Sequence, residues 1–197
     1  MDASQEALQR AVQGQVKELD GRVESGQIAL GEKWAILGRI RACTDLEEGA
    51  AQADLAIEAV PERVDVKRRV WSELDRACPP HTILATNSSS IRVSLLEDAT
   101  RRPDKVLNLH FYATVWERPM VDVQRGTQTS DETFEAGRQF VRSIGCTPLL
   151  VQRESTGFVF NRVWRAVKRE CLHLVDDGVA SFEDVDRAWM IFNNAPI

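Results

Sequence analysis

The sequence predicts an α/β fold, in which a mostly parallel sheet is covered by helices and followed by an all-helical part. Three observations support this prediction. Between residues 53 and 152, short apolar segments alternate with segments of helical periodicity. The apolar segments contain few polar residues, which is typical of strands buried on both faces. After about residue 157 only helical periodicity continues. With 43% hydrophobic and 28% charged residues among 197, the chain has the composition of a globular protein.

Each element follows from a local pattern. We expect helices where apolar residues recur every three or four positions, and strands where a short apolar run lies between turn residues. The expected helices span residues 3–25, 30–40, 63–77, 91–96, 131–144, 158–175 and 181–192. The expected strands span residues 53–60, 82–87, 105–111, 120–123 and 147–152.

Capping residues mark several helix ends. The expected N-caps are Asp2 or Ser4, Ser130 and Ser181, and the expected stops are Gly26, Gly145 and Gly178. The strand pattern is lost near residues 153–157. We therefore predict two units: an α/β unit over residues 1–154 and a helical unit over residues 155–197.

Composition argues against several classes of protein. The net charge of -5 and the lack of a dense basic run argue against a nucleic-acid partner. The apolar runs are too short to span a bilayer, and the N-terminus does not have the pattern of a secretory signal. The four cysteines are far apart, so we expect no metal site and no disulfide framework, and we predict reduced thiols in a cytoplasmic protein.

The segment EAVPE, residues 58–62, ends the first predicted strand. Open α/β sheets bind ligands beyond the carboxyl ends of their strands, and Glu62 and Lys67 follow there. The alternative is a solvated acidic helix start with a basic residue five positions later.

The segment ATNSSS, residues 85–90, ends the next predicted strand. Asn87 and three serine hydroxyls offer short donors and acceptors on one loop. They suit a ligand that carries carbonyl or hydroxyl groups, and they equally suit a helix cap.

His110 ends the third predicted strand, and Asp122 lies twelve residues later between Val121 and Val123. A histidine can act as a general base near neutral pH, and a carboxylate on its other ring nitrogen makes it more effective. The alternative is that Asp122 points to solvent. Because all three loops follow predicted parallel strands, their combination is a stronger indication of a site than any one of them.

The segment STGFVFNRV, residues 155–163, opens the helical unit. Gly157 would relieve backbone crowding where the chain leaves the sheet. Asn161 would lie in the first helical turn. The alternative is an ordinary linker glycine and a surface asparagine.

Several segments match one family together, in order and spacing, from near Met1 to the end of the chain. They are DLAIEAVPERVDVKRRVWSELD, CPPHTILATNSSSI, LHFYATVWERPMVDV, TSDETFEAGRQFVRSIGCTPLLV, STGFVFNRV and DDGVASFEDVDRAW. In these segments the chain resembles the NAD-dependent L-3-hydroxyacyl-CoA dehydrogenases of fatty acid metabolism. The resemblance implies an incomplete Rossmann-type sheet followed by the start of a helical domain that carries the substrate site and the dimer contact. It also implies that a 3-hydroxyacyl thioester is oxidised, with hydride passing to NAD.

The resemblance also carries catalytic roles to matching positions. His110 would be the general base that removes the hydroxyl proton, and Asp122 stands where the family has a glutamate that orients this histidine. Ser89 would touch both the nicotinamide side and the substrate, and Asn161 would bind near the substrate carbonyl.

Three further positions correspond to cofactor contacts. Glu62 and Lys67 would contact NAD together with Ser89. Asp2 falls where the family has the acid that binds the adenosine ribose hydroxyls, which favours NAD over a cofactor with a 2′-phosphate.

The sequence departs from the family at both ends. It contains no glycine-rich GxGxxG turn, which supplies backbone N–H groups to the cofactor phosphates. We therefore expect an internal piece of a longer protein, with little or no catalysis by this chain alone and a homodimer at full length.

Two departures concern the chemistry. Asp122 is one methylene shorter than the expected glutamate, and Tyr112-Ala113-Thr114 replaces the usual Phe-Asn-Pro. They indicate a divergent member, and we cannot place the basic residues that would hold a CoA nucleotide. Two alternatives follow: a dehydrogenase of another small hydroxy acid, or a non-catalytic remnant with a structural or interaction role.

Overall fold

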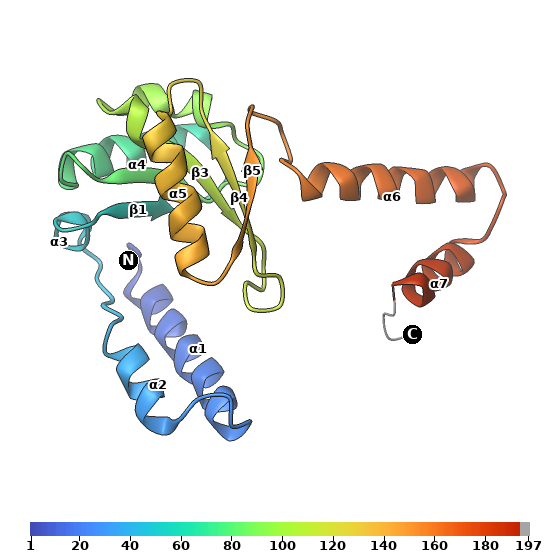
Figure 1. The fold of residues 1–197 in the computed structure, drawn as a ribbon, viewed down its shortest axis with the longest axis horizontal. Helices are drawn as coiled ribbons and strands as arrows, with labels where there is room; N and C mark the ends of the chain where they lie inside the picture. Colours follow the sequence, from blue (N-terminus) through green and yellow to red (C-terminus); the bar gives the residue numbers. More distant parts are fainter. Residues whose placement is uncertain (194–197) are drawn as a thin grey trace.

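A computed structural model of the chain describes residues 1–193. Its centre is a five-stranded sheet in which the strands lie in sequence order (Figure 1). The strands are β1 (Leu55–Glu58), β2 (Ile83–Thr86), β3 (Val106–Phe111), β4 (Met120–Arg125) and β5 (Thr147–Val151). The predicted α/β class is confirmed, and each predicted strand is present. Four strands are slightly shorter than predicted, and β4 extends two residues further than predicted, to Arg125.

The sheet is mostly parallel, as expected, with one reversal. β1, β2 and β3 run parallel, β4 runs antiparallel to β3, and β5 is parallel to β4. The three parallel strands therefore end at one edge of the sheet. The reversal sets residues of β3 directly opposite residues of β4, with His110 opposite Asp122.

Helices cover both faces of the sheet. They include α4 (Val64–Ala77) and α5 (Asp131–Ser143), and α5 lies in front of the strands in Figure 1. On one face, Leu84 packs with Trp71 of α4, and on the other Leu107 packs with Phe134 of α5. Each such buried side chain contributes roughly 1.5–3 kcal/mol through removal of apolar area from water. Burial on both faces explains the near-continuous apolar strands.

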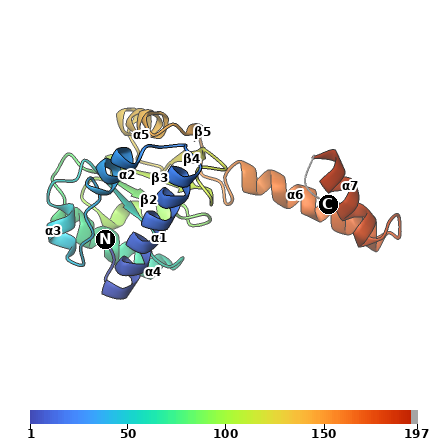
Figure 2. The same ribbon diagram turned by 90° about the horizontal axis from the view of Figure 1, so that it is seen from below.

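Two helical segments extend from this core. Near the N-terminus, α1 (Gln5–Glu24) and α2 (Leu30–Leu37) form a hairpin, followed by the short α3 (Leu46–Ala50). At the other end, α6 (Phe160–Asp176) and α7 (Phe182–Phe192) reach away from the sheet (Figure 2). Neither α6 nor α7 contains a buried residue. In the described part of the chain, no helix is long and apolar enough to cross a membrane.

Local differences from the predicted elements have local causes. α2 ends at Leu37, earlier than predicted, and Gly38 is its C-cap. The helix expected at 158–175 begins only at Phe160, because Gly157 and Phe158 have positive φ angles of 81° and 48°.

Two short elements complete the comparison. The segment 91–96 forms the 3-10 turn η1 (Val93–Leu95), followed by η2 (Glu97–Ala99) and η3 (Pro103–Lys105). The sequence analysis missed α3, whose N-cap Asp45 accepts a hydrogen bond from Glu48 N at 3.0 Å. Residues 194–197, the end of the predicted helical unit, lie outside the described residues.

Candidate functional site

Hydrogen bonds tie together the ends of the three parallel strands. Asn87 follows β2 and lies between its neighbours: its N–H donates to the Glu58 carbonyl at 2.8 Å, and its Oδ1 accepts from Phe111 N at 2.9 Å. Asn108 Nδ2 donates to the Ser88 carbonyl at 2.8 Å. The loop 85–90 is therefore fixed between the ends of β1 and β3, as the strand order requires.

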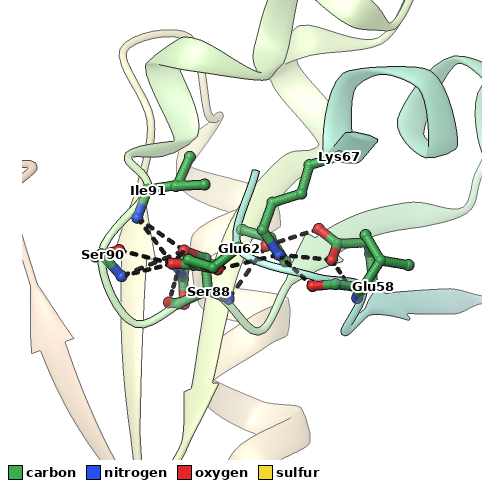
Figure 3. Close-up of polar contacts among 9 residues, drawn as sticks. Glu58, Glu62, Lys67, Ser88, Ser90 and Ile91 are labelled. Atoms are coloured by element: carbon green, nitrogen blue, oxygen red, sulfur yellow. Dashed lines mark hydrogen bonds and ion pairs between the residues drawn. The ribbon is translucent and has the colours of Figure 1, made fainter. Parts of the chain in front are cut away.

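A buried ion pair closes the end of β1. Lys67 Nζ lies 2.7 Å from Glu58 Oε1, and the side chains are 1% and 0% exposed (Figure 3). Lys67 also donates to the Val60 carbonyl at 3.1 Å and lies 3.3 Å from Glu62. Three acceptors therefore surround the ammonium, and Lys67 presents none of its protons to solvent. Loss of one partner would leave an uncompensated buried charge, which is strongly destabilising.

Glu62 accepts several hydrogen bonds from the serine loop, residues 88–91. Its Oε1 accepts from Ser90 Oγ at 2.8 Å, from Ser90 N at 3.1 Å, from Ile91 N at 3.3 Å and from Ser88 Oγ (Figure 3). Partial burial opposes ionisation, but these donors and the Lys67 ammonium outweigh it and lower the pKa of Glu62 to about 2. Glu62 is therefore a carboxylate at neutral pH, with its side chain 38% exposed at the strand edge.

His110 and Asp122 form a hydrogen-bonded pair. Nδ1 of His110 lies 3.1 Å from Oδ2 of Asp122, and both residues are buried. Residues directly opposite each other in an antiparallel pair point to the same face, which explains a contact across twelve positions. The alternative that Asp122 points to solvent is wrong. The shorter acid reaches the histidine directly.

Aromatic side chains surround this pair. Tyr112 Oη donates to Asp122 Oδ2 at 2.5 Å, and its ring meets that of His110 at 4.6 Å. Burial and the Asp122 carboxylate raise the pKa of Tyr112, so its hydroxyl keeps the proton that it donates. Phe158 packs on His110 with ring centres 5.1 Å apart.

The other predicted site residues are less buried than His110 and Asp122. Ser89 is exposed, and unlike its neighbours Ser88 and Ser90 it makes no hydrogen bond to Glu62. Asn161 is half-buried in the first turn of α6. Asp2 is exposed; its carboxylate accepts from Ser4 N at 2.8 Å and its amide donates to the Cys43 carbonyl at 3.3 Å.

Two members of the site were not predicted from the sequence. Glu58 is one of them, although a single acid at the end of an apolar strand indicates a buried partner. Tyr112 was noted only as a departure. Its position two residues after His110 puts both side chains on one side of the extended chain, and this period of two could have identified it.

Comparisons with known proteins show the family of the chain. Residues 1–155 match the family model of the 3-hydroxyacyl-CoA dehydrogenase NAD binding domain, and residues 157–196 match that of the 3-hydroxyacyl-CoA dehydrogenase C-terminal domain. The chain belongs to the 3-hydroxyacyl-CoA dehydrogenase family. The resemblance seen in the sequence is thereby confirmed, and NAD is the cofactor of the matching domain.

Relatives of the chain are named as dehydrogenases of different substrates. A probable 3-hydroxybutyryl-CoA dehydrogenase of Bacillus subtilis is 35% identical over 196 residues, which cover 100% of this chain and 68% of that protein. An L-carnitine dehydrogenase of Bacillus cereus is 40% identical over 144 residues, 73% of this chain and 44% of that protein. The chain therefore spans about half to two thirds of the length of these relatives.

Solved structures of the family share the fold. The crystal structure of (S)-3-hydroxybutyryl-CoA dehydrogenase from Ralstonia eutropha aligns with a TM-score of 0.93 at 31% identity. The alignment covers 100% of this chain and 69% of that one. A Rossmann-type sheet followed by helices is therefore the architecture of this family member.

Side chains at the strand edge fit part of an NAD molecule. Ser89 is exposed between Ser88 and Ser90, the two serines that bind Glu62, and the Glu62 side chain is 38% exposed, so both residues are accessible to a polar ligand. The exposed Asp2 carboxylate suits ribose hydroxyls, whereas Lys67 is already satisfied inside the protein. The sequence contains no GxGxxG turn, and we assign no residue to the pyrophosphate.

Proposed function

We propose that this protein acts as an NAD-dependent 3-hydroxyacyl-CoA dehydrogenase, with His110 as general base. The hydrogen bond of 3.1 Å between buried His110 and Asp122 is the observation that carries the proposal. Family membership supports the proposal. The position of the pair supports it as well, because open α/β sheets bind their ligands at this edge of the strands.

The geometry suits proton abstraction at one defined atom. Because Asp122 accepts from Nδ1–H, the lone pair of His110 lies on Nε2, which faces no hydrogen-bond partner among residues 1–193. Nε2 would take the proton of the C3 hydroxyl, and Asp122 would stabilise the resulting imidazolium. Bound NAD would accept the hydride that leaves C3.

We assign supporting roles to other residues within this proposal. Ser89 would contact the substrate and the nicotinamide side, and Asn161 would bind near the substrate carbonyl from α6. Glu62 and Lys67 would shape the cofactor edge, with Lys67 acting through its ion pairs. Asp2 would hold the adenosine ribose.

A second candidate is a dehydrogenase of a small hydroxy acid without CoA. In the α1–α2 hairpin, Arg22 pairs with Glu18 at 3.0 Å and Lys33 pairs with Asp20, whereas Lys17 forms no ion pair among residues 1–193. Arg22 also lies 5.6 Å from the ring centre of Trp116. The pairing of Arg22 and Lys33 reduces the positive charge that the hairpin offers to the phosphates of a CoA nucleotide, and one relative is named L-carnitine dehydrogenase.

The test is a matched pair of histidine variants. H110Q removes the proposed base, and H81Q removes an exposed histidine that also sits 3.1 Å from an aspartate, Asp54. In a chain that turns over substrate, we expect H110Q to lose at least about a hundredfold in kcat, and H81Q to keep full activity. NADH formation would be followed with NAD and 3-hydroxybutyryl-CoA, 3-hydroxybutyrate or L-carnitine.

The substrates separate the candidates. Turnover of the CoA thioester alone supports the first, and turnover of a free acid alone supports the second. Wild-type activity in H110Q would contradict the catalytic assignment. If neither substrate reacts and NADH does not bind up to millimolar concentration, the non-catalytic alternative gains support.

Several broader predictions stay proposals. We retain the division at residues 154 and 155, a homodimer at full length and a place in fatty acid metabolism. We also retain a cytoplasmic location, which rests on four dispersed free cysteines. Nucleic acid and membranes are not expected partners, given the net charge of -5.

A further inference from the structure

Tyr112 stands outside the roles assigned so far, yet it binds the acid of the proposed pair. Its hydroxyl and Nδ1 of His110 reach the same oxygen, Asp122 Oδ2, at 2.5 and 3.1 Å. The other oxygen, Oδ1, is buried and has no hydrogen-bond partner among residues 1–193. Tyr112 and His110 are thus the two donors that compensate the Asp122 charge.

The surroundings of this triangle contain no competing charge. Asp122 faces His110 from β4, and Tyr112 faces both from the segment after β3. Phe158, just before α6, and Phe160, at its start, contribute their rings, and the backbone N–H of Phe160 donates to the Tyr112 hydroxyl. Asn87, from the loop after β2, is uncharged. Within residues 1–193, no other charged side chain forms an ion pair or hydrogen bond with these three residues.

The electrostatic consequence has a definite sign. When the imidazolium is the single donor to a carboxylate, the electrostatic attraction between the two is strong, because both lie in a low-dielectric site. A second donor on the same oxygen withdraws charge and weakens that hold. Less of the carboxylate charge is then left to stabilise an imidazolium at His110.

We propose that Tyr112 is a positioning residue of the His110–Asp122 pair, whose hydroxyl fixes the short acid and shares the charge of the Asp122 carboxylate with the His110 ring. Its catalytic meaning rests on the proposed dehydrogenase function. The contact itself does not depend on that function.

The direct test is the pH titration of the histidine rings by NMR in the 197-residue chain. Y112F keeps the ring and removes the hydroxyl. We expect the midpoint of His110 to rise by about one pH unit, and those of His81 and His173 to stay constant as internal controls. In a D122N background the same Tyr change should move nothing, because the acid that links the two groups is gone.

A second measurement covers the outcome in which Y112F fails to fold. Tyr112 is the single tyrosine of the chain, so incorporation of 3-fluorotyrosine labels this site alone. The fluorine makes the hydroxyl a stronger donor and leaves the packing nearly intact. The His110 midpoint should then fall, opposite to the effect of Y112F.

The outcomes separate this inference from the proposed function. An unchanged His110 midpoint in folded Y112F, or an unchanged or raised midpoint with fluorotyrosine, overturns the role of Tyr112 even if the chain is an active dehydrogenase. Opposite shifts in the two proteins support it even if no substrate is turned over. Where activity is found, the acidic limb of the kcat/KM profile should move with the NMR midpoint.

Discussion

At the scale of single residues, charge and burial divide the strand edge into two groups. Lys67 and Glu58 are deeply buried and fully paired, so they stabilise the turn from β1 into α4. His110 and Asp122 are buried as well, but Nε2 of the histidine has no hydrogen-bond partner among residues 1–193. The first group holds the edge in place, and the second has the arrangement that proton transfer needs.

Glu62 leads to a pH-dependent prediction. Its pKa is about 2 in the folded chain and near 4.5 when unfolded. A lowered folded pKa stabilises the protein above the unfolded value, and this contribution is lost as the pH falls from 4.5 toward 2. We therefore expect wild type to exceed E62Q in free energy of unfolding by a constant amount above about pH 5.5, and the difference to shrink below that. Urea denaturation at a series of pH values measures it.

Glu135 provides the matched control for E62Q. Hydrogen bonds from Arg138 and Gln139 also lower the pKa of Glu135 to about 2, but this pair lies on the surface of α5. Solvent screening weakens such pairs. E135Q should thus change stability less than E62Q at every pH. An equal effect of both variants would contradict the importance of the serine loop.

At the scale of elements, the same capping motif occurs in two different settings. Ser130 caps α5 and accepts from Thr133 N at 3.1 Å, and Ser181 caps α7 and accepts from Asp184 N at 3.2 Å. α5 buries Phe134 and Val141 against the sheet, whereas α7 buries nothing. Both helices share a serine N-cap that binds the N3 amide, but we expect this cap to contribute differently to global stability.

The two caps give a paired prediction. S130A should lower the free energy of unfolding of the sheet by about 1 kcal/mol, equivalent to roughly 2–4 °C in Tm. S181A should reduce the helical content of α7 and leave the unfolding transition of the sheet unchanged. Thermal unfolding followed by circular dichroism and tryptophan fluorescence measures both. A Tm shift of the same size in S181A would mean that α7 unfolds together with the sheet.

At the scale of the whole molecule, the core and the α6–α7 arm differ in burial. Val106, Leu107 and Leu109 of β3 are fully buried, whereas large apolar side chains of the arm such as Leu172, Phe182 and Phe192 are 63–86% exposed. Elements with few buried contacts open at low free energy. The arm is therefore joined to the sheet through the chain, but it gains little stability from packing against the sheet.

Hydrogen exchange makes this difference measurable. In dilute solution, amides of β2, β3 and β4 should exchange slowest, and those of α6 and α7 should exchange orders of magnitude faster. Exchange would be followed by mass spectrometry at two protein concentrations. Protection of α6 equal to that of β3 at low concentration would contradict the prediction, and protection that grows with concentration would indicate association through the arm.

The sequence alone determined the class, the order of elements and the ends of most helices. Apolar periodicity depends on local geometry, and caps such as Ser130 act within one turn, so both can be read from neighbouring residues. The sequence also proposed the His110–Asp122 pair, whereas the tertiary structure decided how this pair and the other polar residues meet. The antiparallel pairing of β4 with β3 places Asp122 opposite His110. Tyr112 binds the same Asp122 oxygen as His110, and Lys67 is buried among three acceptors. These contacts join residues whose separation depends on strand order and burial, which no local pattern specifies.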